Sequence, residues 1–305
     1  MRYALLSDVH GNLPALEAVL ADLEHQACDE IIVAGDLAAG CPFPRETLAR
    51  LRGLPACRCI RGNNETYLLK IHQRTCHPAV LTSLQWGATR WAYNQLSQED
   101  LEWIETLPAQ LSLDGPGGGV RVVHGSPRRE SEGLVPDQRP DLLEKLRRIH
   151  VLTPGETPPP LSQALALIEE TVLVCGHYHI PWVQVEGKRL VVNPGSVGVP
   201  IHGDPRAQYA LLEWQDERWQ VTFRALDYDL ERCLKAFESS GLLAAGGGYA
   251  RAYRLDVERS TNTLCYFLDY AADLARQHSA SDPSFIPDEV WREAEIRFDW
   301  DQVET

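Results

Sequence analysis

Five short apolar runs in this chain each end at a residue that could ligate a metal ion. Each run is typical of a buried strand, and a glycine close to each ligand candidate permits a tight turn. In chain order the candidates are Asp8 with His10, Asp36, Asn63, His124, and His177 with His179. The loops at the carboxyl ends of strands form the ligand crevice of an open α/β sheet, so we expect these side chains to converge.

The first pair of candidates would prove little if it stood alone. Asp8-Val9-His10 also suits an ordinary turn beside a surface histidine. The later segments repeat the same position, directly after a strand-like run, and this repetition favours one shared site.

The alternation of sequence patterns predicts the fold class. The first 65 residues predict a parallel βαβαβ unit, with strands at 2–7, 31–35 and 57–61 and helices at 13–26 and 44–52. Helices are also expected between residues 65 and 107, where Ser97 has the position of an N-cap.

Three hairpins are expected further along the chain, at 111–123, 182–192 and 207–224. We expect the last two to form a second, mostly antiparallel sheet. The polar, proline-rich stretch 125–160, with a short helix near 141–149, is interpreted as a surface excursion.

The chain resembles the calcineurin-like metallophosphoesterase superfamily, whose pattern is Asp-x-His, Gly-Asp, Gly-Asn-His-Asp/Glu, His and Gly-His-x-His in that order. All five blocks occur in order across residues 8–179. The segments Val123-His124-Gly125-Ser126-Pro127 and Asn193-Pro194-Gly195-Ser196-Val197 look most like the superfamily's small bacterial and archaeal phosphodiesterases. The resemblance implies a four-layer α/β/β/α sandwich.

The resemblance also implies a centre of two divalent metal ions that share Asp36. The first ion would be held by Asp8, His10, Asp36 and His179, and the second by Asp36, Asn63, His124 and His177. Carboxylate, amide and imidazole ligands suit borderline divalent ions, with manganese first and iron, zinc or nickel as alternatives. Such ions acidify bound water, and metal-bound hydroxide would then attack phosphorus.

One position departs from the family pattern. Asn64 stands where the family has the histidine that assists the leaving group, and an amide cannot protonate an alkoxide at neutral pH. His202 is the first suspect as a replacement proton donor. Arg206 is a candidate phosphate clamp, with a salt-bridged surface arginine as the alternative, and Tyr67 could border the substrate.

The composition restricts the partners. The net charge is −14, with 29 basic against 43 acidic residues, which argues against a long nucleic-acid footprint. Eight cysteines without zinc-ribbon spacing are interpreted as reduced thiols. No signal-type segment and no apolar run of about 18 residues is present, so we expect a cytoplasmic protein without a membrane anchor.

These patterns predict a catalytic domain at 1–225 and a mostly helical extension at 226–305, broken near 246–248 and 279–284. We expect the extension to pack, to form homo-oligomer contacts or to cover the site.

The expected function is a phosphodiesterase acting on a small nucleotide-like substrate. Hydrolysis of dinucleoside polyphosphates and protein serine/threonine phosphatase activity are the enzyme alternatives. A metal-stabilised binding or regulatory protein is the non-enzyme alternative.

Overall fold

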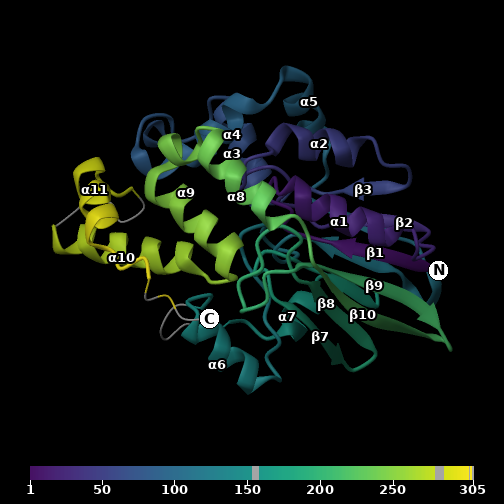
Figure 1. The fold of residues 1–305 in the computed structure, drawn as a ribbon. Helices are drawn as coiled ribbons and strands as arrows, with labels where there is room; N and C mark the ends of the chain where they lie inside the picture. The colour runs from purple at the N-terminus through teal and green to yellow at the C-terminus, as the bar shows by residue number, and fades with distance from the viewer. Residues whose placement is uncertain (153–157, 279–284, 302, 304–305) are drawn as a thin grey trace.

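Two five-stranded sheets form the centre of the protein in the computed structural model, which describes residues 1–152, 158–278, 285–301 and 303 (Figure 1). The first sheet has the order β10-β9-β1-β2-β3. Its strands are β1 (Arg2–Leu6), β2 (Glu30–Val33), β3 (Cys57–Cys59), β9 (Ala207–Gln215) and β10 (Arg218–Leu226). β1, β2 and β3 are parallel and are connected by α1 (Leu13–Leu23) and α2 (Pro44–Arg52), so the predicted βαβαβ unit is confirmed.

The second sheet has the order β4-β5-β6-β8-β7. Its strands are β4 (Gln110–Leu113), β5 (Val120–Val123), β6 (Val172–Val174), β7 (Pro181–Glu186) and β8 (Arg189–Pro194). β5, β6 and β8 are parallel, whereas the β4–β5 and β7–β8 pairs are the predicted antiparallel hairpins.

The sequence had led us to expect the third hairpin in the second sheet, and this expectation is wrong. β9 pairs with β1 instead, antiparallel, with Ala4 opposite Leu211. The first six residues of β9 are all buried, because both faces of the strand are covered. Such a strand suits the interior of a sheet, and β1 has an edge opposite β2 with which β9 can pair. This pairing depends on residues distant in the sequence and not on local periodicity.

Hydrophobic residues fill the space between the sheets and the space between each sheet and its helices. Leu5, Ile32, Val122, Val174 and Leu212 belong to the cluster between the sheets. The outer face of the second sheet packs on α7 (Leu161–Leu165), and α1 and α2 pack on the first. The four-layer α/β/β/α arrangement is therefore confirmed.

The described part of the first 226 residues contains four further α-helices. They are α3 (Asn63–His72), α4 (Gly87–Gln95), α5 (Gln98–Thr106) and α6 (Pro140–Arg148), with short 3₁₀ turns at Pro78–Leu81, Leu84–Trp86 and Pro116–Gly118. Ser97 caps α5 as predicted, since its hydroxyl accepts the backbone N–H of Asp100 at 3.2 Å.

The 125–160 segment is only partly a surface excursion. Leu134, Val135, Leu146, Ile149 and Leu152 are buried, because α6 and its flanks pack on the core. Residues 153–157 of this segment lie outside the described residues.

The C-terminal extension is helical, as predicted. It contains α8 (Leu230–Ser239), α9 (Leu242–Arg259), α10 (Thr263–Gln277) and α11 (Asp288–Arg297), coloured green to yellow in Figure 1. Gly247 interrupts the helical backbone of α9 at φ 51°, and the other expected break, at 279–284, lies outside the described residues.

The apolar stripes of the extension are largely buried within the chain. Phe237 and Tyr253 join the cluster that contains Leu16 of α1, while Phe267 and Trp291 lie in a separate cluster formed mainly by α9, α10 and α11. The domain boundary at 225 and a homo-oligomer both stay predictions. Among the described helices, none has the length and apolar character that a bilayer span requires.

Candidate metal centre

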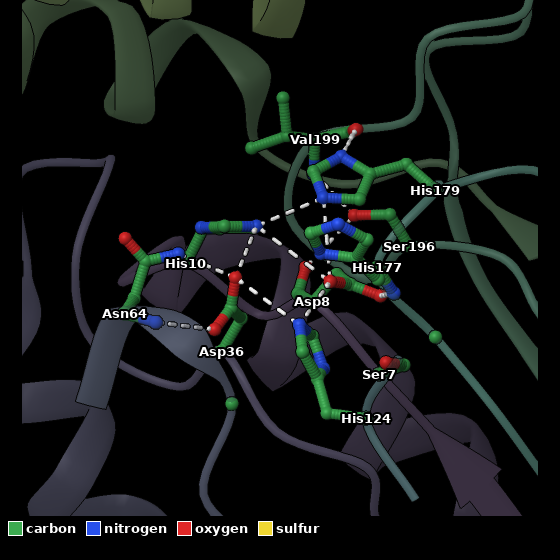
Figure 2. A network of polar contacts seen from close by, with 12 residues as sticks. Ser7, Asp8, His10, Asp36, Asn64, His124, His177, His179, Ser196 and Val199 are labelled. Carbon is green, nitrogen blue, oxygen red and sulfur yellow. Dashed lines mark hydrogen bonds and ion pairs between the residues drawn. The ribbon is translucent and has the colours of Figure 1, made fainter. Parts of the chain in front are cut away.

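The predicted ligands converge at the carboxyl ends of strands from both sheets, and Figure 2 shows all of them except Asn63. Asp8 and His10 follow β1, Asp36 follows β2, and Asn63 begins α3 directly after β3. From the second sheet, His124 follows β5, and His177 and His179 follow β6. The position of these side chains agrees with the expectation from the strand-end pattern, and metal binding by them stays a prediction.

Several of these residues have a left-handed backbone. Asp8, His10, Asp36, His177 and His179 have φ of 55°, 53°, 52°, 70° and 55°. Such conformations cost about 1–3 kcal/mol each in non-glycine residues and concentrate at functional sites. Because these conformations occur at the ligand candidates, we infer that the loop backbone directs these side chains towards the centre.

Three histidines direct their Nε2 atoms towards the centre. The Nδ1 atoms of His10, His124 and His179 lie 2.7 Å from the backbone oxygens of Ala39, Ala34 and Val199, respectively. A carbonyl oxygen only accepts, so each Nδ1 carries a proton, and Nε2 is the ring nitrogen that faces the centre. The Nε2 atoms of His10 and His179 are 3.0 Å apart, a separation that a shared cation between them explains.

A buried carboxylate oxygen completes this arrangement. Asp8 Oδ1 has no hydrogen-bond partner among the described residues, and the side chain is fully buried. It lies 3.3 Å from His179 Nε2 and 3.8 Å from His10 Nε2. A buried carboxylate oxygen without a hydrogen bond is costly unless a cation satisfies it, and Asp8 Oδ1 together with imidazole Nε2 atoms is a donor set that fits a divalent metal ion.

The second half of the centre surrounds His124. Asp36 Oδ2 lies 3.4 Å from His124 Nε2 and 3.8 Å from His10 Nε2, so it lies between the two halves. Asn63 Oδ1, an acceptor, lies 3.2 Å from the same His124 nitrogen. Asp8 also falls within the second potential cluster, with Asp36 and His124.

The local electrostatics favour positive charge at the centre. Burial tends to lower the pKa of His124, but Asp36 and Asp8 raise that pKa to about 10. Burial, followed by the charge of His124, lowers the pKa of His177 to about 4, which leaves its ring neutral and able to ligate. The carboxylates thus attract a cation, whether it is a proton or a metal ion.

Glu65 is a structural element of this site that the sequence analysis did not select. Its buried carboxylate accepts the backbone N–H groups of Asp36 at 2.9 Å, Leu37 at 2.8 Å, Ala38 at 3.2 Å and Gly62 at 2.9 Å. Burial and the charge of Asp36 raise the pKa of Glu65 to about 7. The available signal was the position of Glu65 three residues after Gly62, from which its side chain reaches back to the Gly62 N–H as in one half of a capping box.

We expect Glu65→Gln to destabilise the protein strongly. Two of the four N–H groups would then face an amide nitrogen and lose their acceptor, at about 1–3 kcal/mol for each group. The measurement is urea unfolding of the metal-free protein, with Glu46→Gln on the exposed face of α2 as the control. A loss below about 1 kcal/mol, close to the effect of an ordinary surface substitution, would contradict this role.

The loop after β8 supports the β1 loop from the opposite side. Ser196 Oγ donates to the backbone oxygen of Asp8 at 2.8 Å, and Gly198 N–H donates to the same oxygen at 3.0 Å. Val199 orients His179, as described above. Ser196, Gly198 and Val199 thus lie beside the candidate ligands Asp8 and His179.

Asn64 and Tyr67 both line the cavity in front of the centre. The backbone N–H of Asn64 donates to Asp36 Oδ1 at 2.9 Å, and its side-chain amide donates to Asp36 Oδ2. Asn64 therefore orients Asp36. Tyr67 packs edge-on against Trp86, with ring centroids 5.3 Å apart.

His202 and Arg206 are not among the described residues that line this cavity. His202 Nε2 lies 3.3 Å from the Gln208 amide, and burial lowers the pKa of His202 to about 4, which makes it a poor proton donor at neutral pH. Arg206 is partly exposed and pairs with Asp204 at 2.6 Å, the arrangement of a surface salt bridge.

Comparison with known proteins places this geometry in a family. The profile of the calcineurin-like phosphoesterase superfamily domain matches residues 1–217. An uncharacterized protein of Methanocaldococcus jannaschii, MJ0912, is 26% identical over 255 residues, which cover 77% of this chain and 90% of that protein. Phosphodiesterase YfcE of Escherichia coli is 25% identical over 217 residues, covering 70% of this chain and 88% of YfcE.

A solved structure agrees with both comparisons. The metallophosphoesterase of Sphaerobacter thermophilus has a TM-score of 0.61 and 28% identity, and the match covers 81% of this chain and 99% of that one. With five ligand blocks converging on one centre and the profile matching residues 1–217, the chain belongs to the calcineurin-like phosphoesterase superfamily.

Proposed function

We propose that this protein is a dinuclear metal-dependent phosphodiesterase that hydrolyses a small nucleotide-like substrate. The observation that carries the proposal is the convergence of three imidazole Nε2 atoms on the unpaired Asp8 Oδ1 and on Asp36. Membership of the superfamily supports hydrolysis of a phosphoester, and the name of YfcE supports the diester.

The residues divide the work as follows. Asp8, His10, Asp36 and His179 would hold one ion, and Asp36, Asn63, His124 and His177 the other, with Asp36 shared. When bound, two divalent ions supply positive charge for the phosphoryl oxygens and lower the pKa of water. Glu65 and Asn64 fix the position of Asp36, and the Nδ1 contacts orient the rings of His10, His124 and His179 so that Nε2 is the nitrogen available to a metal ion.

A phosphoanhydride such as diadenosine tetraphosphate is a second candidate substrate. A cavity of about 360 Å³ borders Asn63 and His124 and is lined by Lys70, Arg128, Arg129 and Glu130, and both arginines pair with Glu132. Three cationic side chains against two carboxylates leave a small excess of positive charge, which favours a substrate with further negative charge.

A metal-reconstituted screen tests the proposal. The protein would be loaded with manganese, iron, zinc or nickel and assayed on phosphodiesters, phosphomonoesters and dinucleoside polyphosphates. We expect the highest kcat/KM on a diester and two ions per chain. No metal-dependent hydrolysis of any of these classes by the folded, metal-replete protein would overturn the enzyme proposal in favour of a binding protein.

We further expect the hydrolysis rate to depend steeply on the acidity of the leaving group. General-acid help is typically worth about 10²–10⁴-fold, and Asn64 cannot supply it. Phenolate and phosphate leaving groups should therefore react faster than simple alkoxides. The measurement is the slope of log kcat/KM against leaving-group pKa for aryl and alkyl phosphodiesters.

Asn64→His should flatten that slope by helping poor leaving groups most. Because the substitution also removes an amide contact to Asp36, the matched control is Asn64→Ala, which loses the contact without gaining a proton donor. Loss of such an outer-shell contact typically lowers metal affinity or activity about 10–100-fold. Equal slopes for the two variants, or a shallow slope in the native protein, would show that another group supplies the proton.

A further inference from the structure

The cavity in front of the metal ligands has one wall made by the C-terminal extension. Its volume is about 250 Å³, and His10, Asp36, His177 and His179 lie along one side. The extension contributes a second set of lining residues, which are Tyr249, Tyr253, Asp256, Asn262, Leu264 and Cys265. Residues from α9 and α10 thus border the same space as the ligands.

Two tyrosines of α9 form the aromatic part of this wall. Tyr249 and Tyr253 are one helical turn apart and stack, with ring centroids 5.4 Å apart and an interplanar angle of 26°. Tyr253 is buried against the ring of His10, at 5.6 Å between centroids, whereas Tyr249 is partly exposed. Gly40 permits this approach, because a Cβ there would lie 2.6 Å from Tyr253 and 3.2 Å from His10.

Two further aromatic residues line the cavity from the catalytic part of the chain. Tyr67 comes from α3, and Tyr178 lies between the two histidines that follow β6, with its ring centroid 5.3 Å from that of His177. Aromatic side chains from three different segments therefore border one small space. Such a lining suits a planar ring, since base–aromatic stacking is favourable and does not need a particular base.

Two polar side chains of the extension wall, Asp256 and Asn262, are already engaged. Asp256 accepts from the backbone N–H of Leu264 at 3.2 Å and from the Thr261 hydroxyl at 3.2 Å, and the Asn262 amide donates to the backbone oxygen of Ile149 at 2.7 Å. No Lys or Arg is among the described lining residues. The part of a ligand that lies against this wall should therefore be uncharged, and the negatively charged part of the same ligand should lie at the metal centre.

We propose that the cavity beside Tyr249 and Tyr253 binds an aromatic ring attached to the phosphoryl group that lies at the metal centre. The C-terminal extension then selects phosphoesters that carry an aryl group or a nucleobase. This inference rests on the proposed function. A volume slightly below the roughly 300–1,000 Å³ of typical drug-sized sites suits one such group.

Non-hydrolysable phosphonates test the inference by direct binding. Phenylphosphonate and cyclohexylphosphonate have the same charge and nearly the same size, so their affinity ratio measures the preference for a planar ring. Calorimetry on the metal-loaded protein should give about 2–12-fold tighter binding of phenylphosphonate. A nucleoside 5′-methylphosphonate, compared with its ribose analogue, shows whether a nucleobase or only a simple aryl ring is accepted.

The matched variants are Tyr249→Leu, Tyr249→Phe and Tyr270→Leu. Tyr249→Leu should remove most of the preference and Tyr249→Phe should keep it. Tyr270 is a partly buried tyrosine of α10 that is not among the described lining residues and packs against Phe298, so Tyr270→Leu should also keep the preference.

Each outcome has a defined meaning. Equal affinities for the two phosphonates, or an unchanged preference in Tyr249→Leu, would overturn the aromatic site. Methylphosphonate, which has no ring, would still bind in a metal-dependent way in that case, and the proposed function would stand. If the metal-loaded protein bound none of the phosphonates, the phosphoryl site and this inference would both fail.

Discussion

Asp36→Ala should lose both metal ions and almost all hydrolytic activity. The Asp36 carboxylate lies between the two halves of the centre, 3.4 Å from His124 Nε2 and 3.8 Å from His10 Nε2. Loss of an outer-shell contact typically lowers metal affinity or activity roughly 10–100-fold, and removal of a shared ligand should lower both by more than that. Elemental analysis of the folded variant, together with kcat/KM on an aryl phosphodiester, measures both effects.

The matched control for this substitution is Asp204→Ala. Asp204 pairs with Arg206 and is not among the described residues that line the cavity, so its removal should leave metal content and turnover unchanged. Circular dichroism would verify that both variants are folded. If Asp36→Ala kept two ions, or kept one ion and most of the turnover, the shared-carboxylate arrangement would be wrong.

Local sequence patterns predicted the parts of the fold that depend on neighbouring residues. The alternation of apolar runs and helical stripes predicted β1, α1, β2, α2 and β3, because these periods are set within each segment. The ligand candidates were found for a related reason. Parallel strands present their carboxyl ends at one edge, so a polar residue after each strand is directed towards the same crevice.

Contacts between residues far apart in the chain were harder to predict from the sequence. The β9–β10 hairpin has a pattern that fits either sheet, and its pairing with β1 joins Ala4 to Leu211, some two hundred residues apart. Glu65 was not selected because an acidic residue in the first turn of a helix is ordinary, and only the fold brings it to Asp36, Leu37 and Ala38. Tyr249 and Tyr253 belong to an amphipathic pattern typical of any packed helix.

Ending the chain at Leu226 should prevent the remaining residues from forming a stable native fold. Phe237, Leu242, Tyr253 and Val257 of the extension lie in the same hydrophobic cluster as Leu16 of α1. The loss of one large buried side chain costs about 2–5 kcal/mol, whereas a whole domain is stable by about 5–15 kcal/mol. Several such losses together should exceed the stability available.

A second truncation, after Gln277, provides the comparison. It keeps α8, α9 and α10 and removes α11, whose Trp291 packs against Phe267 with ring centroids 5.0 Å apart. Because α11 packs in the separate cluster with α9 and α10, and not in the cluster that contains Leu16, this chain should retain near-ultraviolet circular dichroism, two metal ions and turnover, but with a lower free energy of unfolding. Light scattering on all three chains would give their mass and show whether the newly exposed apolar surface causes association.

The opposite result for the shorter chain would change the domain assignment. The 1–226 protein could instead be soluble, with native near-ultraviolet circular dichroism, two ions and turnover within about tenfold of the full chain, which corresponds to a barrier change below about 1.4 kcal/mol. That result would show that the first 226 residues fold independently. The contacts of Phe237 and Tyr253 would then be those of a docked second domain. Cooperative loss of structure in 1–226, with 1–277 still folded, would show instead that α8 and α9 belong to the catalytic unit.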